Sequence, residues 1–249
     1  FKDIWNHMIK PKKSGLGKQK RFFNEIESVA ISLNFLKNKF QVIYDESLDL
    51  INGIVRNLHS FNKNRCKENM ARKTEIAIIK KLDDFELNHL NWKHAGLKMH
   101  LPNLSKKIKK IAYELDTLSE REVNDIRGLL TEAVACSFLG DVRAQNNLIW
   151  DCSFFNNNKC ISVGKTKTTD IYYKDFHVHL YECKTKPYFK TAQFDFMCKV
   201  QEEYAKEGTQ VSLFTFVLQY SHHPTFDEEI RKIPNHFEIK TLESLKQCH

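Results

Sequence analysis

The stretch TTDIYYKDFHVHLYECKTKP, residues 168–187, decides the fold of the second half of the chain. It contains two runs rich in aromatic and β-branched residues, 170–173 and 177–185, with three residues between them. Such runs are typical of β-strands. Parallel strands need a crossover of a dozen or more residues, so these two are predicted to form an antiparallel hairpin.

Side chains of one strand alternate between the two faces of a sheet, so the second run divides into two sets. One face carries His177, His179, Tyr181 and Cys183, and the other carries Val178, Leu180, Glu182 and Lys184. A carboxylate and an ammonium group therefore continue an apolar stripe towards the C-terminal end of the strand. Charged groups that are partly removed from water must be paired or ligated.

Asp170 belongs to the same predicted site. If the hairpin loop centres on Phe176, Asp170 lies opposite Glu182, with the two Cβ atoms about 4.5–5.5 Å apart. Two carboxylates at that distance repel each other unless a cation lies between them. Together with Lys184 they form a hard oxygen site suited to Mg²⁺ or Mn²⁺.

The predicted elements on either side of this hairpin complete a fold. Residues 119–139 form a helix, and Ser119 with Glu122 makes a capping box at its start. After it come strands at 148–155, 170–173 and 177–185, a helix at 191–207 that ends at Gly208, a strand at 211–220 and a further strand at 237–241. This order predicts the α/β class, with a mixed β-sheet in an α-β-β-β-α-β core.

The first half of the chain has helical periodicity instead. Apolar residues recur at three- and four-residue steps over 22–58, 71–90 and 104–115, and Ser105 is a candidate cap for the third helix. The segment KPKKSGLGKQK, residues 10–20, has the composition of a flexible basic segment. We therefore expect a basic, mainly helical region over 1–117 and an α/β domain over 118–249.

The net charge of +8 lies entirely in the first half. Residues 1–125 hold 24 Lys and Arg against 16 Asp and Glu, whereas residues 126–249 hold 15 of each. Basic clusters attract nucleic acid, because each Lys or Arg that neutralises a phosphate releases counterions. A solvated helix face is the alternative reading of such runs. The densest cluster consists of Lys106, Lys107, Lys109 and Lys110.

The string D(x)11ExK, formed by Asp170, Glu182 and Lys184, resembles the PD-(D/E)xK nucleases of the restriction-endonuclease-like superfamily. The element order from 119 to about 220 resembles the common core of that family. The likeness covers about 100 of the 249 residues. It departs from the motif at Thr169, where the family name has proline. A structural hairpin with a surface ion pair, and a nuclease-like fold without activity, remain the alternatives.

The resemblance implies a metal-dependent endonuclease that hydrolyses phosphodiester bonds, with DNA favoured over RNA as the substrate and restriction or defence as the expected setting. It also implies that an acidic residue on the first core helix joins the metal ligands Asp170 and Glu182. The matching residue is Glu132, which shares a helix face with Leu129 and Cys136. On the helix after the ExK strand, Gln201 is a candidate to face the site, and Tyr204 is assigned to the core.

Four lysines flank the predicted site in sequence and are candidates to steer a phosphate backbone as point charges: Lys165, Lys167, Lys186 and Lys190. Ordinary surface lysines are the alternative. The pair His177 and His179 has a spacing that can ligate zinc, but no third ligand is evident. Because many enzymes of the resembled family cut two strands as dimers, a homodimer is among the expected partners.

The setting is predicted to be the cytoplasm. Seven cysteines at scattered spacings, without a CxxC pair, favour reduced thiols over a disulfide or zinc framework. No apolar run approaches the roughly 20 residues that span a bilayer, so no membrane partner is expected. Because the chain begins with Phe1, an upstream domain or a partner protein is a further expectation. Two competing classes are a catalytically inactive nucleic-acid-binding module and a helical interaction protein.

Overall fold

The computed structural model describes residues 9–14, 20–89, 94–139, 147–219 and 224–246, which form two compact units. The helical unit consists of residues 20–89 and 94–139, and the sheet unit consists of the other described residues. The expected boundary at 117/118 differs from this division. The helix that begins at Glu120 packs against two helices of the first half and belongs to the helical unit.

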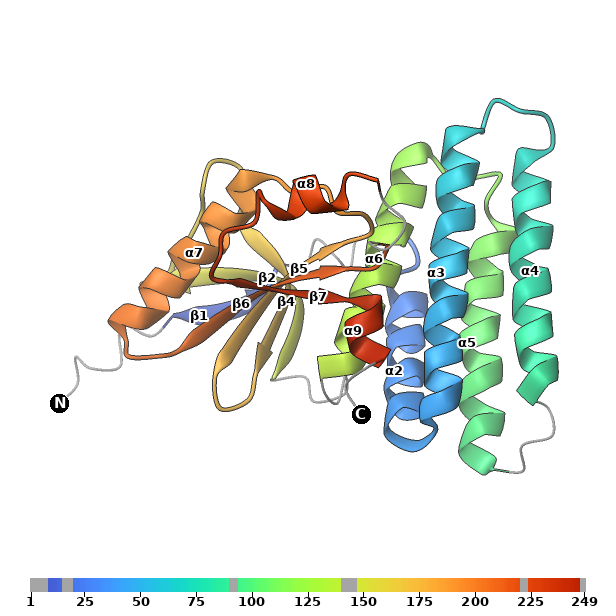
Figure 1. The fold of residues 1–249 in the computed structure, drawn as a ribbon, viewed down its shortest axis with the longest axis horizontal. Helices are drawn as coiled ribbons and strands as arrows, with labels where there is room; N and C mark the ends of the chain where they lie inside the picture. Colours follow the sequence, from blue (N-terminus) through green and yellow to red (C-terminus); the bar gives the residue numbers. More distant parts are fainter. Residues whose placement is uncertain (1–8, 15–19, 90–93, 140–146, 220–223, 247–249) are drawn as a thin grey trace. The chain divides into compact units, whose positions relative to one another are not determined.

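The helical unit contains five helices among its described residues: α2 (Phe23–Lys39), α3 (Gln41–Lys63), α4 (Met70–His89), α5 (Ala95–Tyr113) and α6 (Glu120–Leu139) (Figure 1). Each one buries an apolar stripe, as the three- and four-residue spacing predicts. Helix α2 packs against α3, α5 and α6, and α4 packs against α3 and α5. No described helix is both long enough and apolar enough to traverse a bilayer.

Two predicted helix boundaries in this unit were wrong. The pattern over 22–58 is two helices, because Phe40 leaves the helical conformation (φ −147°, ψ 69°). Its ring packs 6.0 Å from Phe35 and 4.8 Å from His94, between ring centroids, which is a tertiary contact that no Gly or Pro marks in the sequence. The third helix begins at Ala95 with His94 as its cap, so Ser105 is a buried mid-helix residue.

The capping box at the start of α6 is confirmed. The Glu122 backbone N–H donates to Ser119 Oγ at 3.2 Å, and the Ser119 backbone N–H donates to Glu122 Oε2 at 2.8 Å. These reciprocal bonds satisfy two donors that a helix start leaves open. The start of α6 was therefore predicted correctly from the sequence.

The sheet unit is built on one mixed sheet of seven described strands, in the order β1-β2-β4-β5-β6-β7, with β3 beside β2. The strands are β1 (Lys10–Lys13), β2 (Leu148–Asn156), β3 (Lys159–Cys160), β4 (Thr168–Lys174), β5 (Val178–Lys184), β6 (Val211–Val217) and β7 (Phe237–Thr241). Strands β5, β6 and β7 run parallel, and the other neighbouring pairs are antiparallel. The predicted α/β class and mixed sheet are confirmed.

The predicted hairpin register is also confirmed. Strands β4 and β5 pair antiparallel, with Ile171 opposite Tyr181 and Tyr172 opposite Leu180. This is the register of a loop centred on Phe176. The paired residues end at Ile171 and Tyr181, and Asp170 and Glu182 are the next residues of the two strands.

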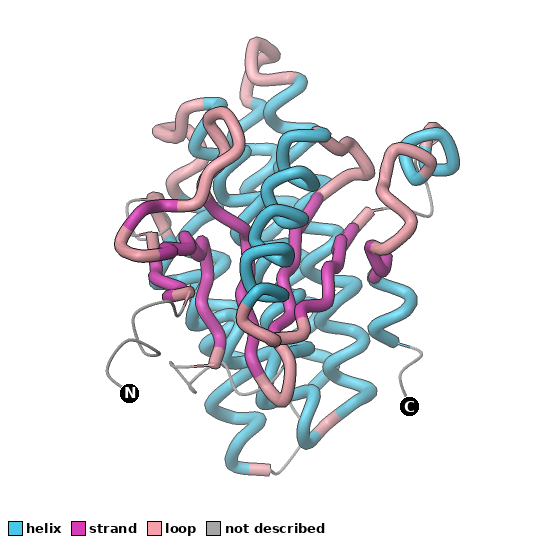
Figure 2. The backbone as a smooth tube through the Cα atoms, turned by 90° about the vertical axis from the view of Figure 1, so that its left-hand side faces the viewer, coloured by secondary structure: helices cyan, strands magenta, loops and turns pink. Residues whose placement is uncertain are grey.

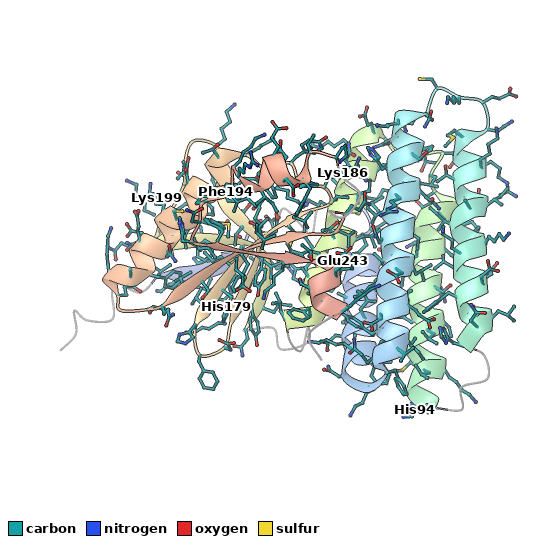
Figure 3. The ribbon with its side chains drawn as sticks, in the orientation of Figure 1. His94, His179, Lys186, Phe194, Lys199 and Glu243 are labelled. Atoms are coloured by element: carbon teal, nitrogen blue, oxygen red, sulfur yellow. The ribbon has the colours of Figure 1, made fainter. Side chains whose placement is uncertain are left out.

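Helix α7 (Thr191–Lys206) crosses one face of this sheet, as Figures 1 and 2 show. Phe194, which is labelled in Figure 3, belongs to the buried cluster between this helix and the strands. The strands contribute Tyr172, Leu180 and Leu213 to that cluster. Gly208 follows the end of α7 and adopts the left-handed conformation (φ +72°), so it ends this helix as predicted.

Several elements of the sheet unit were not predicted. Residues Lys10–Lys13, expected to be flexible, form the edge strand β1, with Pro11 opposite Phe154. An edge strand tolerates proline because one side of its backbone has no neighbour to bond. The rest of that basic segment, residues 15–19, lies outside the described residues. The short elements β3, α8 (Phe226–Ile230) and α9 (Leu242–Lys246) are too brief to show a period.

Candidate active site

A polar row crosses three neighbouring strands on the face that α7 covers. Tyr172, Leu180 and Leu213 all lie in the cluster beneath α7. Side chains two residues along a strand share a face, so Asp170, Glu182 and Thr215 continue that face in β4, β5 and β6. Glu182 is the direct partner of Thr215 in the parallel β5–β6 register. The apolar stripe of the sheet therefore ends in two carboxylates and a hydroxyl.

Glu182 is the most buried charged group of this row, with 2% of its surface exposed. Its Oε1 atom accepts hydrogen bonds from Lys184 Nζ and from Gln193 Nε2. The Cys183 backbone N–H donates to Asp170 Oδ2 at 2.7 Å. The structure thus brings Asp170, Glu182 and Lys184 together, as predicted from their spacing.

The electrostatics of the site follow from this burial. Removal from water and, to a lesser extent, the charge of Asp170 together raise the pKa of Glu182 to about 7, against the opposing effects of Lys184 and Gln193. Burial lowers the pKa of Lys184, but the charges of Glu182 and Asp170 outweigh burial, so its pKa is raised. The Lys184 amine therefore stays protonated. Because this one positive charge cannot balance two negative charges, ionising both Asp170 and Glu182 costs free energy.

Gln193, in the first turn of α7, was not recognised as a site residue from the sequence. Its Nε2 atom donates to Glu182, while its Oε1 atom is buried without a hydrogen-bond partner. A glutamine near a helix start carries no motif, and only the packing of α7 on the sheet brings it to Glu182. The candidate identified instead, Gln201, donates to the Val211 carbonyl at 2.7 Å, at the opposite end of β6. That assignment was wrong.

The residues present fit a hard divalent cation. Mg²⁺ prefers carboxylate and amide oxygens and keeps several of its waters. The site offers the carboxylates of Asp170 and Glu182, and the unpartnered Gln193 Oε1 is an amide oxygen beside them. The raised pKa of Glu182 also fits a cation site, because a cation would supply the positive charge that the ionised Asp170 and Glu182 lack.

The sheet unit by itself supplies two of the three predicted carboxylates. Glu132 lies on α6 in the helical unit, buried with 6% of its surface exposed, on the same apolar face as Leu129 and Cys136. Within the ranges that the structure describes, no three His, Cys, Asp or Glu side chains come together in a way that would hold a metal ion. The role of Glu132 as a third ligand stays a prediction.

The four flanking lysines lie in the segments just before β4 and just after β5. In an antiparallel pair, the start of β4 and the end of β5 lie at the same edge, so Lys165 and Lys167 come near the end of the sheet where Lys186 and Lys190 follow β5. Figure 3 labels Lys186 at this end and His179 towards the other end of β5. Lys165, Lys167 and Lys190 are exposed, and Lys186 is partly exposed. The topology therefore brings the backbone segments that carry these lysines to the same edge of the strand pair.

The lysine cluster of α5 divides into two kinds. Lys109 contacts Asp83 at 2.7 Å and Glu86 at 3.3 Å, and Lys110 contacts Glu25 at 2.6 Å. All four lysines line one open cavity of about 870 Å³, together with Glu25, Glu86 and Glu114. Half of the cluster is thus committed to ion pairs within the helical unit. Lys106 and Lys107 remain candidates to bind phosphate, and the charge of Lys107 helps to lower the pKa of Glu25.

The remaining candidates have structural roles. Tyr204 is 5% exposed and belongs to the core, as assigned. His179 Nε2 lies 2.9 Å from Asp175 Oδ1, and His177 is exposed in the hairpin loop before β5 begins. Neither histidine belongs to a cluster of metal-ligating side chains in the described part of the chain.

The arrangement thus consists of paired carboxylates, one buried ammonium, an amide from α7 and a rim of lysines. No family model and no curated protein matches this chain. What the site does must follow from its own chemistry.

Proposed function

We propose that the protein is a Mg²⁺- or Mn²⁺-dependent nuclease that hydrolyses phosphodiester bonds, with DNA as the favoured substrate and RNA as the alternative. In this proposal α6, β2, β4, β5, α7 and β6 form a restriction-endonuclease-like core. The observation that supports it most is the convergence of Asp170, Glu182 and Lys184 at one buried end of the β4–β5 hairpin. Paired carboxylates beside a lysine are the groups that phosphodiester hydrolysis by a metal site requires.

Each side chain has a distinct task in this reaction. Asp170 and Glu182, both in the sheet unit, hold the cation. When bound, the cation lowers the pKa of a water molecule and withdraws charge from the phosphoryl oxygen. Lys184 orients the attacking water, helps to deprotonate it or balances the charge that develops on the phosphorus centre. Gln193 fixes the Glu182 carboxylate through its Nε2 donor.

Substrate capture is assigned to the basic rim. Lys165, Lys167, Lys186 and Lys190 surround the catalytic end of the sheet and attract the phosphate backbone without reading sequence. In the helical unit, Lys106 and Lys107 extend the proposed nucleic-acid surface, since both line the open cavity along α5. Lys109 and Lys110 are left out of this surface because they already pair with Asp and Glu.

A second candidate function is a nuclease-like module that binds nucleic acid without cutting it. One contact favours it: Lys184 Nζ pairs directly with Glu182 Oε1, so this carboxylate has a cationic partner even without a metal ion. Such a module would retain the lysine rim and lose only the chemistry. Binding without cleavage would distinguish it.

Cleavage of plasmid and single-stranded DNA in Mg²⁺, Mn²⁺ or EDTA tests the proposal. Replacement of Lys184 by Ala is expected to lower the cleavage rate at least about 100-fold, because a buried group that stabilises charge in the transition state contributes on that scale. Lys174→Ala is the matched control, since Lys174 is an exposed lysine of the same hairpin at its other end. It should cleave as the wild type does.

The outcomes separate the two candidates. Cleavage that EDTA abolishes and Lys184→Ala suppresses supports the nuclease. Equal cleavage by the wild type and Lys184→Ala would remove Lys184 from the reaction. A folded wild type that binds DNA but leaves every substrate intact would favour the binding module.

A further inference from the structure

Thr215 is the third member of the polar row and the one whose presence is hardest to explain by folding alone. It lies directly beside Glu182 in the β5–β6 register and is fully buried. Neighbouring strands are about 4.8 Å apart, which sets the Thr215 side chain next to the Glu182 carboxyl on the same face. The strand positions before it on this face, Val211 and Leu213, are apolar.

The hydroxyl of Thr215 has no hydrogen-bond partner among the described residues, although its surroundings exclude bulk water. Buried polar groups in folded proteins are almost always satisfied, so an unsatisfied one calls for an explanation such as a bound water or ion. Thr169 provides the contrast within the same sheet. It is equally buried, but its hydroxyl donates to the Tyr181 carbonyl at 2.8 Å.

A second unpartnered atom lies against the same carboxylate. Gln193 Oε1 is buried without a partner, while the Nε2 atom of that amide donates to Glu182. One hydroxyl from β6 and one amide oxygen from α7 therefore flank Glu182 from two elements. Both can accept hydrogen bonds from water, and Mg²⁺ and Mn²⁺ sites of this kind keep several waters in their coordination shell.

We propose that Thr215, together with Gln193, binds the water shell of the divalent cation held by Asp170 and Glu182. Thr215 is thus a positioning residue, and it acts through the waters rather than on the scissile phosphate. This inference rests on the proposed nuclease function for the identity of the cation. It adds a residue of β6 to a site that sequence motifs assign to β4 and β5.

The test measures cation affinity rather than cleavage. Titration with MnCl₂, followed by the electron paramagnetic resonance signal of free Mn²⁺, gives the affinity of the wild-type protein, and Glu182→Gln defines binding elsewhere on the chain. Thr215→Val keeps the shape and removes the hydroxyl. Loss of an outer partner of a metal site is expected to weaken binding about 10- to 100-fold. Thr215→Ser, which restores a hydroxyl, should recover the affinity.

Thermal stability without cation provides the independent readout. Replacement of an unsatisfied buried hydroxyl by a methyl group should leave the melting temperature unchanged or raise it. Thr169→Val is the matched control, because it removes a satisfied hydroxyl. It should lower the melting temperature and retain wild-type Mn²⁺ affinity.

Three results are decisive. Weaker Mn²⁺ binding by Thr215→Val, with Thr169→Val unaffected, supports the proposal. Equal affinity of Thr215→Val and the wild type overturns it and leaves the nuclease untouched, since cleavage by the wild type and Lys184→Ala is measured separately. A wild type that binds no Mn²⁺ overturns the proposal as well, and overturns the nuclease only if cleavage is also absent.

Discussion

Opposing effects act on the protonation of the Glu182 carboxyl. Its side chain is 2% exposed, which favours the neutral acid, whereas its hydrogen bonds from Lys184 and Gln193 favour the carboxylate. Burial and the neighbouring Asp170 prevail, and the pKa rises to about 7. The chain retains this carboxyl at a site where an apolar residue would pack without electrostatic cost, which fits a functional rather than a structural role.

The sign of this pKa shift predicts how stability depends on pH. A carboxyl whose pKa is raised in the folded state stabilises the fold below its unfolded value of about 4.5, and this contribution is lost as pH rises through about 7. Glu182→Gln should remove this dependence. The melting temperature measured in EDTA should therefore fall more steeply from pH 5 to pH 8 in the wild type than in Glu182→Gln.

The same melting temperatures measured with Mg²⁺ in place of EDTA test whether a cation binds these carboxylates. A cation that binds the ionised carboxylates should restore wild-type stability at pH 8 and leave Glu182→Gln almost unchanged. Because both proteins share the same histidines, the difference between them isolates Glu182. Parallel pH curves for the two proteins would contradict the shifted pKa.

At the scale of elements, the strength of the local signal decided what could be predicted. The β4–β5 hairpin and α6 were recognised because alternation, a short loop and a capping box act within a few residues of each other. The elements that were missed depend on distant partners. Strand β1 exists because it pairs with β2, about 140 residues away, and the break at Phe40 depends on ring contacts with Phe35 and His94.

The capping box gives a prediction for α6. Ser119→Ala removes the acceptor for the Glu122 N–H and should lower the free energy of unfolding by about 1 kcal/mol. Chemical denaturation monitored by circular dichroism measures this loss. Ser28→Ala is the control, because Ser28 lies within α2 and its hydroxyl only bonds back to the Asn24 carbonyl. A similar loss in both variants would argue against a specific cap.

At the scale of the whole molecule, the lysine side chains that carry the positive charge fall into two groups. Part of this charge is neutralised within the fold, as for Lys109 and Lys110, and part is exposed to solvent, as for Lys165 and Lys167 before the start of β4. Net charge alone does not separate these groups. Only the ion pairs of the folded chain show which lysines are available.

This division predicts the salt dependence of DNA binding. Joint replacement of Lys165 and Lys167 by Gln should weaken binding and reduce the slope of log affinity against log salt by roughly one to two, since each phosphate contact contributes about 0.9. Replacement of Lys109 and Lys110 by Gln removes the same charge and should leave the slope nearly unchanged. Fluorescence anisotropy at several salt concentrations measures both, and equal slopes for the two double variants would refute the division.

The sequence alone determined the α/β class, the hairpin with its register, the start of α6 and the grouping of Asp170, Glu182 and Lys184. These features follow from periodicities and spacings that act over a few residues. Only the tertiary structure decided that α6 packs with the helical unit, that Gln193 rather than Gln201 reaches Glu182, and that Thr215 lies unpartnered beside it. The physical reason is that these contacts join elements whose packing depends on the whole core, for which no local pattern encodes the partner.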